Sequence, residues 1–492
     1  MTFISTRGYQ NSEDNFLKVV QMGLAPDGGL FLPKEFPKIS LDEIDLLQDL
    51  SYQERLFLIL QKFELAIPEE NLIEMIEKAY SDFNSEKICP LSELEENTNI
   101  LELFHGPTAS FKDMGLQLTP HFFDASKENI DEKFCIVTAT SGDTGIAAIE
   151  GFKKIENMSV FIIYPKDGVS DLQKKQMQSV SDKNVKVMGV DGDFDFCQNA
   201  TKQLFTDEKF TQKIQENFNT KFAAGNSMNW GRLLPQIGYY FSAYADLLEQ
   251  KKITLGEEIE FCVPSGNFGN ILGAFMAKKM GLPISKFICA SNENNILTEF
   301  LNTGIYDISE KSLIKTDSPS IDILKSSNIE RLLYFLTEEN PENTIYIKNL
   351  FEELNTNKKF EVTPEILEKI KESFVADFST ESEMQETIKK YSEEKSLILD
   401  PHTAVAVCVS DKTNLSQNTQ RIIASTAHFG KFTPAIEKAL EKKLSNISYK
   451  NSEHKKLLDI QNRKSVQTDF ISNSYSDLLH AVENFLEIQK KK

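Results

Sequence analysis

The sequence predicts an α/β protein with two doubly wound, mostly parallel-sheet domains and a mainly helical N-terminal domain. From residue 134 onward, short apolar runs alternate with helical stretches. This strand–loop–helix order is typical of parallel sheets with helices on both faces. The first 95 residues show helical periodicity instead. A chain of 492 residues is long enough for two or three domains with ample cores.

The N-terminal segment, residues 1–95, is predicted to form a cap domain. Apolar residues recur at helical spacing in 52–65 and 71–79. Between residues 24 and 33, Pro26, Gly28 and Gly29 predict a loop because their backbone preferences favour turns.

The rest of the chain divides into two α/β domains and a tail. Residues 126–224 are predicted to form a small domain, with strands at 134–138, 160–165 and 185–190. Residues 96–125 and 225–445 are predicted to form a large domain, with strands at 100–104, 259–263, 287–290, 396–399 and 421–426. The charged segment 335–395 is expected to be solvated helical surface, and residues 446–492 a helical tail.

Composition limits the kinds of partner. The formal charge of −20 argues against nucleic acid and anionic membranes, although a local cluster could still bind a small anion. The six cysteines form no CxxC pair and the six histidines show no ligand spacing, so we expect buried thiols and no metal site. No signal-like or membrane-spanning run is present. We therefore expect a cytoplasmic enzyme.

Lys112 is the candidate nucleophile. Ser110 and Asp113 stand three residues apart, like an N-cap and its N3 partner, which would place Lys112 in a first helical turn. The positive end of the helix dipole disfavours an ammonium group there. A lysine that is partly neutral can form a Schiff base with an aldehyde. The alternative for this residue alone is a solvated lysine beside an aspartate.

Two loops are suited to anions. Residues 265–270 follow a predicted strand and open a helix, where successive N–H groups can hold a phosphate. Residues 140–145 form a second such helix start. Each loop taken alone is as consistent with a turn or a simple helix cap. Together with Lys112, they fit a phosphorylated aldehyde cofactor and an acidic substrate.

Six motifs follow one another along the chain. They lie at 105–113 (HGPTASFKD), 138–145 (TATSGDTG), 226–230 (NSMNW), 264–269 (PSGNFG), 400–404 (DPHTA) and 425–428 (STAH). With these motifs the chain resembles the threonine synthase family, pyridoxal-phosphate enzymes of the tryptophan-synthase-β-like fold. Together with the flanking segments Ser5-Thr-Arg-Gly8, 25–30, 318–323 and 327–331, the motifs span residues 5 to about 432 in the family's order.

The resemblance implies roles for individual residues. Lys112 would bind pyridoxal 5'-phosphate covalently between the two domains, and Thr426 would face the pyridine nitrogen. Arg232 would contact the substrate phosphate, although a surface salt bridge is an equal alternative for it. The other implied residues are Gly266, Asn267, Phe268, Gly269 and Asn270 for the cofactor phosphate; Ser141, Gly142, Asp143 and Thr144 for the substrate carboxylate; and Asn226 and Asn229 for the substrate phosphate.

The resemblance also implies an activity, the conversion of O-phospho-L-homoserine and water to L-threonine and phosphate. Two alternatives stay open. One is a phospholyase that releases phosphate, a keto acid and ammonia, and the other is a non-catalytic binding protein. We expect a monomer or weak homodimer.

Overall fold

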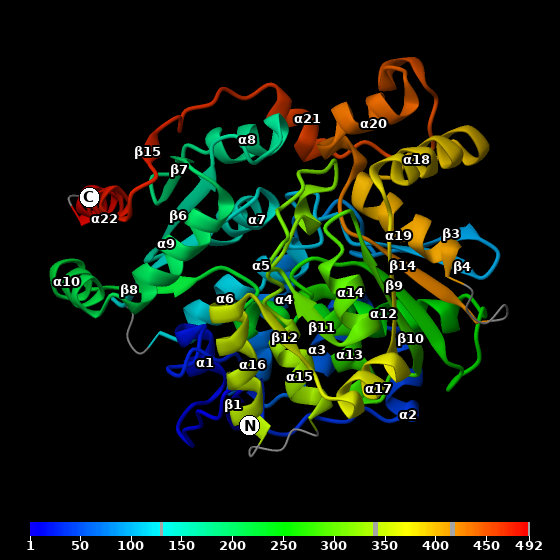
Figure 1. Cartoon of the computed structure of the whole chain (residues 1–492), viewed down its shortest axis with the longest axis horizontal. Coiled ribbons are helices and arrows are strands. Elements are labelled where there is room, and N and C mark those ends of the chain that lie inside the picture. Colours follow the sequence, from blue (N-terminus) through cyan, green and yellow to red (C-terminus); the bar gives the residue numbers. More distant parts are fainter. Residues whose placement is uncertain (128–130, 338–342, 414–418, 491–492) are drawn as a thin grey trace.

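Two sheets organise the molecule (Figure 1). The structure, a computed structural model, describes residues 1–127, 131–337, 343–413 and 419–490. One sheet has six strands in the order β13-β10-β9-β14-β4-β3, and the other has five in the order β15-β7-β6-β5-β8. Among these pairings only β3 with β4 is antiparallel. The predicted α/β class with parallel-sheet cores is confirmed.

The six-stranded sheet has a hydrophobic core on each face. Ile259, Phe261 and Val263 of β9 belong to one core with helices α12 and α13. Cys262 points the other way, into the core under α18 and α19. This follows from the two-residue period of a strand. The bounds are β3 (Leu91–Glu95), β4 (Thr98–Glu102), β9 (Ile259–Pro264), β10 (Ile284–Ser291), β13 (Phe374–Phe378), β14 (Arg421–Ser425), α12 (Gln236–Glu249), α13 (Gly269–Met280), α18 (Glu381–Lys395) and α19 (Pro401–Lys412).

The five-stranded sheet is also covered on both faces. Ile136 and Ile162 pack on the side of α7 and α8, whereas Val137 and Phe161 pack with α9, α10 and α22. The doubly wound arrangement is therefore as predicted. The bounds are β5 (Lys133–Ala139), β6 (Met158–Pro165), β7 (Val185–Asp191), β8 (Thr220–Ala224), α7 (Asp143–Phe152), α8 (Asp171–Gln178), α9 (Phe194–Thr206), α10 (Glu208–Phe218) and α22 (Tyr475–Lys490).

The C-terminal segment is more than a helical tail. It contains α21 (Lys455–Gln461) and α22, but also β15 (Phe470–Ser472), which pairs in parallel with β7. The side chain of Gln467 also bonds to β7, accepting from Val187 N and donating to Val185 O. The segment thus supplies an edge strand of the five-stranded sheet. A three-residue strand is too short to give a recognisable sequence pattern.

Two further predictions need correction. Residues 396–399 form no strand, because Ile398 makes its N–H and C=O hydrogen bonds with the side chain of Asn451. The segment 335–395, expected to be helical surface, contains the sheet strand β13. In addition, β3 lies in the predicted cap domain by sequence but pairs with β4 of the large sheet.

The N-terminal segment is mainly helical, as expected, with one small hairpin-like sheet of β1 (Phe3–Ser5) and β2 (Phe31–Pro33). Ser40 and Ser51 form capping boxes at the starts of α2 and α3. These helices share one continuous core with the large domain. Their bounds are α1 (Phe16–Met22), α2 (Leu41–Leu46), α3 (Tyr52–Gln61) and α4 (Glu69–Tyr80).

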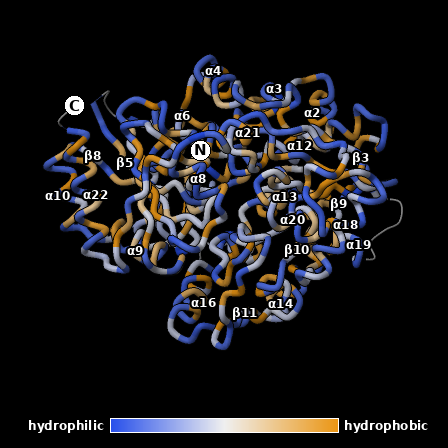
Figure 2. Tube along the Cα trace, turned by 90° about the horizontal axis from the view of Figure 1, so that it is seen from above, coloured by the Kyte–Doolittle hydropathy of each residue, from blue (hydrophilic) through white to orange (hydrophobic). Residues whose placement is uncertain are grey.

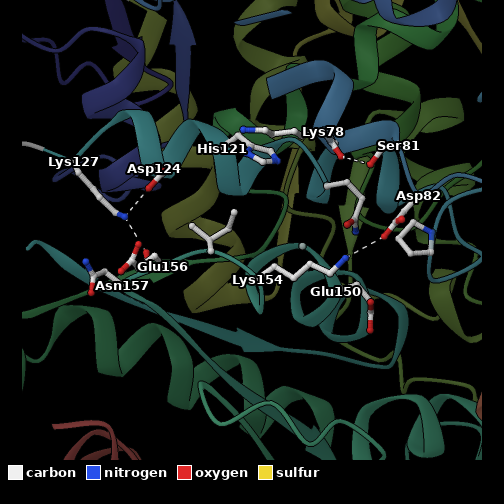
Figure 3. A pocket seen from close by; sticks show the side chains of 15 residues that line it. Lys78, Ser81, Asp82, His121, Asp124, Lys127, Glu150, Lys154, Glu156 and Asn157 are labelled. Atoms are coloured by element: carbon white, nitrogen blue, oxygen red, sulfur yellow. Dashed lines mark hydrogen bonds and ion pairs between the residues drawn. The ribbon is translucent and has the colours of Figure 1, made fainter. Parts of the chain in front are cut away.

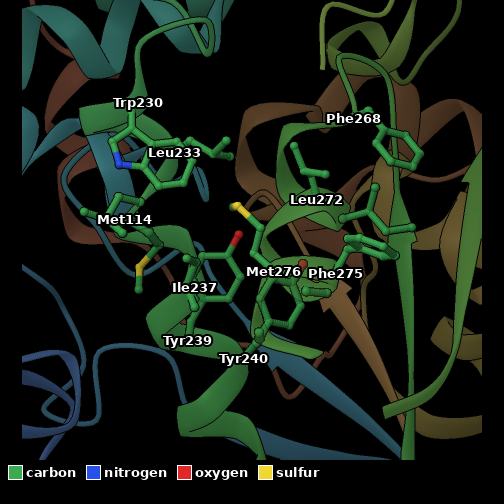
Figure 4. Close-up of a cluster of buried hydrophobic side chains, with 14 of the residues drawn as sticks. Met114, Trp230, Leu233, Ile237, Tyr239, Tyr240, Phe268, Leu272, Phe275 and Met276 are labelled. Carbon is green, nitrogen blue, oxygen red and sulfur yellow. The ribbon is translucent and has the colours of Figure 1, made fainter. Parts of the chain in front are cut away.

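Figure 4 shows part of the common core, with Trp230 at one side of the drawn cluster. Trp230 lies beside Leu233 and Met114 there, and Tyr239 and Tyr240 extend toward Met276 of α13. A separate lobe protrudes from the large domain in Figure 2 around α14, β11 and α16. Remaining elements are α14 (Ile296–Thr303), β11 (Ile305–Asp307), α15 (Ile329–Leu336), α16 (Thr344–Asn357), β12 (Lys359–Glu361), α17 (Pro364–Ser373) and α20 (Thr433–Leu440). None of the helices in the described ranges is long and apolar enough to cross a membrane.

Candidate active site

Lys112 ends the loop between β4 and the short helix α5 (Asp113–Leu116). Its Nζ lies 3.6 Å from Asp143 Oδ2, and its side chain is only 10% exposed. Burial lowers the pKa of Lys112 to about 8, and the nearby cations Lys431 and Arg232 add to this, while Asp143 opposes it. The amine is therefore partly neutral near neutral pH, as predicted.

The predicted cause of this lowering is wrong. Lys112 is the N-cap residue of α5, which has four residues, and not part of a first helical turn. Asp113 does not form a capping pair with Ser110; its carboxylate accepts from Thr108 N at 2.8 Å and Thr108 Oγ1 at 2.9 Å. Burial raises the pKa of Asp113 to about 7. Tertiary burial, and not a helix dipole, sets the state of the amine.

Asp143 and Lys431 form a buried ion pair next to Lys112. Asp143 Oδ1 accepts from Lys431 Nζ at 2.6 Å and from Gln173 Nε2 at 2.8 Å, and Oδ2 accepts from Ser320 Oγ at 3.2 Å. Burial alone would raise the pKa of Asp143, but Lys431 and Lys112 hold it well below its usual range. Sequence reasoning missed Lys431. The available signal was a lysine within the aromatic stretch 429–432, an unusual place for a solvated charge.

The loop 140–145 is shaped by Thr140. Its Oγ1 accepts from Gly142 N at 3.0 Å and from Gly145 N at 2.9 Å. Gly142 has φ of 133°, a conformation that side chains rarely adopt. The N–H groups of residues 141, 143 and 144 find no acceptor among the described residues. They open the helix α7 and can receive a carboxylate, so Asp143 would contribute its backbone and not its side chain.

The loop 264–270 opens α13 in the same way. Phe268 adopts a left-handed conformation with φ of 60°, and none of the N–H groups of 266–270 donates within the described part of the chain. Asn270 Oδ1 accepts from the Tyr239 and Tyr240 hydroxyls, whereas its Nδ2 is buried without a partner there. A Cβ on Gly266 would lie 3.0 Å from Ile321 Cα. These free donors fit a phosphate ester.

The two loops meet through the segment that contains Ser320. Its hydroxyl donates to Asp143 at the start of α7, and its carbonyl oxygen lies 3.3 Å from the position that a Cβ on Gly266 would take. Asn328 extends this connection, because its Nδ2 donates to Asn267 O at 2.9 Å. The structure thus brings Lys112 and both predicted anion loops into one site.

Thr426 directly follows β14 and is buried. Its carbonyl accepts from Phe111 N at 2.8 Å, next to Lys112. No hydrogen bond of its hydroxyl is found among the described residues. The side chain is therefore free to meet a nitrogen acceptor of a bound ring.

The three predicted anchors for the substrate phosphate differ. Arg232, in α11 (Trp230–Leu233), is buried, donates only to Gly225 O at 3.3 Å and has no acidic partner among the described residues. Burial lowers its pKa to about 10. The alternative of a surface salt bridge is thus wrong. Asn226 donates weakly to Ala139 O at 3.4 Å.

Asn229 is not available as an anchor. Its Oδ1 accepts from Gly231 N at 2.9 Å, and its Nδ2 donates to Val20 O at 2.9 Å. Both side-chain atoms are used to cap α11 and to hold α1 against it. The structure corrects its expected role to a structural one.

A cavity of about 840 Å³ lies between α4, α6 (Thr119–Ala125) and α7 (Figure 3). Its charges largely pair with each other, as Lys154 does with Asp82 and Lys127 with Asp124. Its lining includes neither Lys112 nor either loop, so it is separate from the candidate site. In the described ranges, no group of three or more His, Cys, Asp or Glu side chains could hold a metal ion.

Comparison with known proteins agrees with this geometry. The family model "Pyridoxal-phosphate dependent enzyme" matches residues 89–425, and models of the threonine synthase N terminus and C-terminal region match residues 2–80 and 403–480. The chain is 45% identical to threonine synthase-like 1 of Homo sapiens, over 90% of this chain but only 61% of that protein. It is 41% identical to threonine synthase of Saccharomyces cerevisiae, over 90% of each.

A solved structure extends the agreement to the fold. The crystal structure of PLP-bound threonine synthase from Brucella melitensis superposes with a TM-score of 0.87 at 34% identity, covering 99% of each chain.

Proposed function

The chain belongs to the threonine synthase family of pyridoxal-phosphate-dependent enzymes, and from this we propose that it converts O-phospho-L-homoserine and water to L-threonine and phosphate. The observation that carries the proposal is one connected site: the open N-terminus of α7 lies beside Lys112, Ser320 links it to the open N-terminus of α13, and the buried Arg232 acts on Lys112 while it has no acidic partner among the described residues. The amine of Lys112 suits the aldehyde of the cofactor. The two helix starts and Arg232 suit the cofactor phosphate and the carboxylate and phosphate of the substrate.

Different residues would bind different parts of the cofactor. We propose that the N–H groups of 266–270 hold the cofactor phosphate, that Thr426 faces the ring nitrogen, and that Lys112 carries the cofactor. Two observations support this assignment: the buried Nδ2 of Asn270 has no partner among the described residues, and the buried Thr426 makes no side-chain hydrogen bond there. The bound cofactor would supply an electron sink for the charge that develops next to the substrate amine.

The substrate would be held at both ends. The free N–H groups at the start of α7 suit the α-carboxylate, and Arg232 suits the phosphate because a guanidinium can donate two parallel hydrogen bonds to it. Asn226 lies in the turn that precedes α11, the helix that carries Arg232, and we keep Asn226 as a phosphate contact.

Lys112 would move the protons. Once released by the substrate amine, it can accept the proton from Cα, since its lowered pKa leaves it partly neutral. Loss of a proton at Cβ would allow phosphate to leave from Cγ. A proton would then add at Cγ, the former leaving-group carbon, after which water adds at Cβ and a proton returns to Cα to complete threonine. We also propose a cytoplasmic location, which the six buried free thiols support.

Product analysis in ¹⁸O-labelled water tests the activity. The holoenzyme should turn O-phospho-L-homoserine into threonine with the label in its hydroxyl and none in the phosphate. Formation of 2-oxobutanoate and ammonia would assign the phospholyase alternative instead. Labelled phosphate with homoserine would indicate a phosphatase, and no product would indicate a binding protein. The variant Lys112→Ala is the inactive control.

A further inference from the structure

Lys431 has no part in the functions considered so far, yet its ammonium group is wholly buried. Its side chain is 0% exposed and lies in the short 3₁₀ segment η4 (Phe429–Lys431) after β14. Burying a cation is costly unless it is paired and hydrogen-bonded. Lys431 meets this condition with Asp143 Oδ1 at 2.6 Å and Thr108 O at 3.0 Å. It is therefore fixed from two sides within the site.

The two carboxylate oxygens of Asp143 have different partners, at different distances. Oδ1 takes two close donors, Lys431 at 2.6 Å and Gln173 at 2.8 Å. Among the described residues, Oδ2 accepts from the Ser320 hydroxyl at 3.2 Å and forms a longer ion pair with Lys112 Nζ at 3.6 Å. The contact of Asp143 with Lys431 is thus 1.0 Å shorter than its contact with Lys112.

We propose that Lys431 is a positioning residue that holds Asp143 back from Lys112 and so keeps the reacting amine free to exchange its proton. Asp143 remains near enough to stabilise the ammonium form of Lys112 after it accepts a proton. Without Lys431, Asp143 would close on Lys112 and hold it in the protonated state. The inference rests on the proposed function only in taking Lys112 as the reacting amine.

The other groups around the pair do not replace Lys431. Arg232 of α11 is the second cation that lowers the pKa of Lys112, but it makes no ion pair with Asp143. Asp113 is turned toward Thr108, as described above. The charged groups that act on Lys112 are Asp143, Lys431 and Arg232, and the centroid of the Phe111 ring lies 4.8 Å from its Nζ. The described groups that contact Asp143 are Lys431, Lys112, Gln173 and Ser320.

The test measures Lys112 itself in the apoprotein. Acylation with limiting acetic anhydride between pH 6 and 10, followed by peptide mass spectrometry, gives the pH at which this amine becomes reactive. Lys431→Met should move the midpoint to higher pH by on the order of one unit, because a cation is lost and Asp143 is released. Asp143→Asn should move it to lower pH. Lys431→Arg, which keeps the charge, should leave it near the parent value.

A double variant separates positioning from simple charge repulsion. If Lys431 acts by restraining Asp143, Lys431→Met must shift the midpoint less in the Asp143→Asn background than in the parent. Equal shifts in both backgrounds, or none in the parent, would overturn the proposal. The double variant removes both members of the Lys431–Asp143 ion pair, so neither of these two charges is left without the other, and it remains measurable if Lys431→Met alone does not fold.

Lys438→Met is the matched control, since Lys438 pairs with Asp317 on the surface and its loss changes net charge equally. In the holoenzyme, Lys431→Met should lower kcat more than it raises KM and shift the acid limb of the kcat profile upward. The apoprotein titration needs no turnover, so it tests the role of Lys431 separately from the proposed activity. The expected shifts can be absent although threonine is formed, and they can be present although the proposed substrate does not react.

Discussion

Replacing Arg232 by methionine should make the free protein more stable while impairing its activity. Burial lowers the pKa of this arginine from 12.5 to about 10, which corresponds to roughly 3 kcal/mol of destabilisation of the charged form. Because the folded pKa lies below the unfolded one, this penalty is fully present below pH 10 and lifts only as pH rises through that range. Near neutral pH, the substitution removes it.

The loss of a hydrogen bond partly offsets this gain in the free energy of unfolding. Arg232 donates one long hydrogen bond to Gly225 O, whose loss costs about 1 kcal/mol. The free energy of unfolding of the apoprotein should therefore rise by about 1–3 kcal/mol, measured by urea denaturation in phosphate-free buffer. If Arg232 binds the substrate phosphate, kcat/KM should fall by about 100-fold or more, because a charge-assisted bidentate contact is lost.

A second buried arginine provides the control. Arg55 is equally buried but pairs with Asp246 at 2.5 Å. Arg55→Met leaves that carboxylate unpaired and should destabilise the protein by about 3–5 kcal/mol. Destabilisation by Arg232→Met of the same size, with unchanged kcat/KM, would refute the view that Arg232 is held unpaired for a substrate anion.

Two further variants test the cofactor and carboxylate sites. Thr426→Val keeps the shape of the side chain and removes the hydroxyl, so it should change the absorbance spectrum of the holoenzyme and reduce turnover. The expected cost is about 1–3 kcal/mol, because a buried acceptor is left unpaired. Identical spectra and rates would place the ring nitrogen elsewhere. Gly142→Ala puts a side chain on a residue with φ of 133°, and its Cβ would lie 2.5 Å from Gln173. The free energy of unfolding, measured by thermal unfolding, should therefore fall by about 1–3 kcal/mol. Unchanged stability would mean that the loop relaxes freely.

Local patterns were sufficient for the elements that lie at the centre of each sheet. Strands such as 134–138 and 259–263 are continuous apolar runs because both faces of a parallel sheet are covered, and the structure has β5 and β9 there. Edge strands were missed. β13 and β15 lie at sheet edges and are three to five residues long, so they carry too few buried positions to form a pattern.

The sequence by itself determined which residues could carry the chemistry. The lysine in its family motif and the two glycine-containing helix starts are local features, because backbone N–H groups at a helix start need only the right turn residues. Asn229 shows the limit of this reasoning. An amide next to a motif can equally cap a helix, and only the folded neighbours Val20 and Gly231 decided that it does.

Only the tertiary structure decided the charge state of the site. The low pKa of Lys112 comes from burial and from Lys431 and Arg232, which stand 319 and 120 positions away in the chain. Desolvation and Coulomb interactions depend on distance in space and on exclusion of water, neither of which a sequence spacing contains. The same reason explains why Lys431 went unnoticed until the fold placed its ammonium group against Asp143.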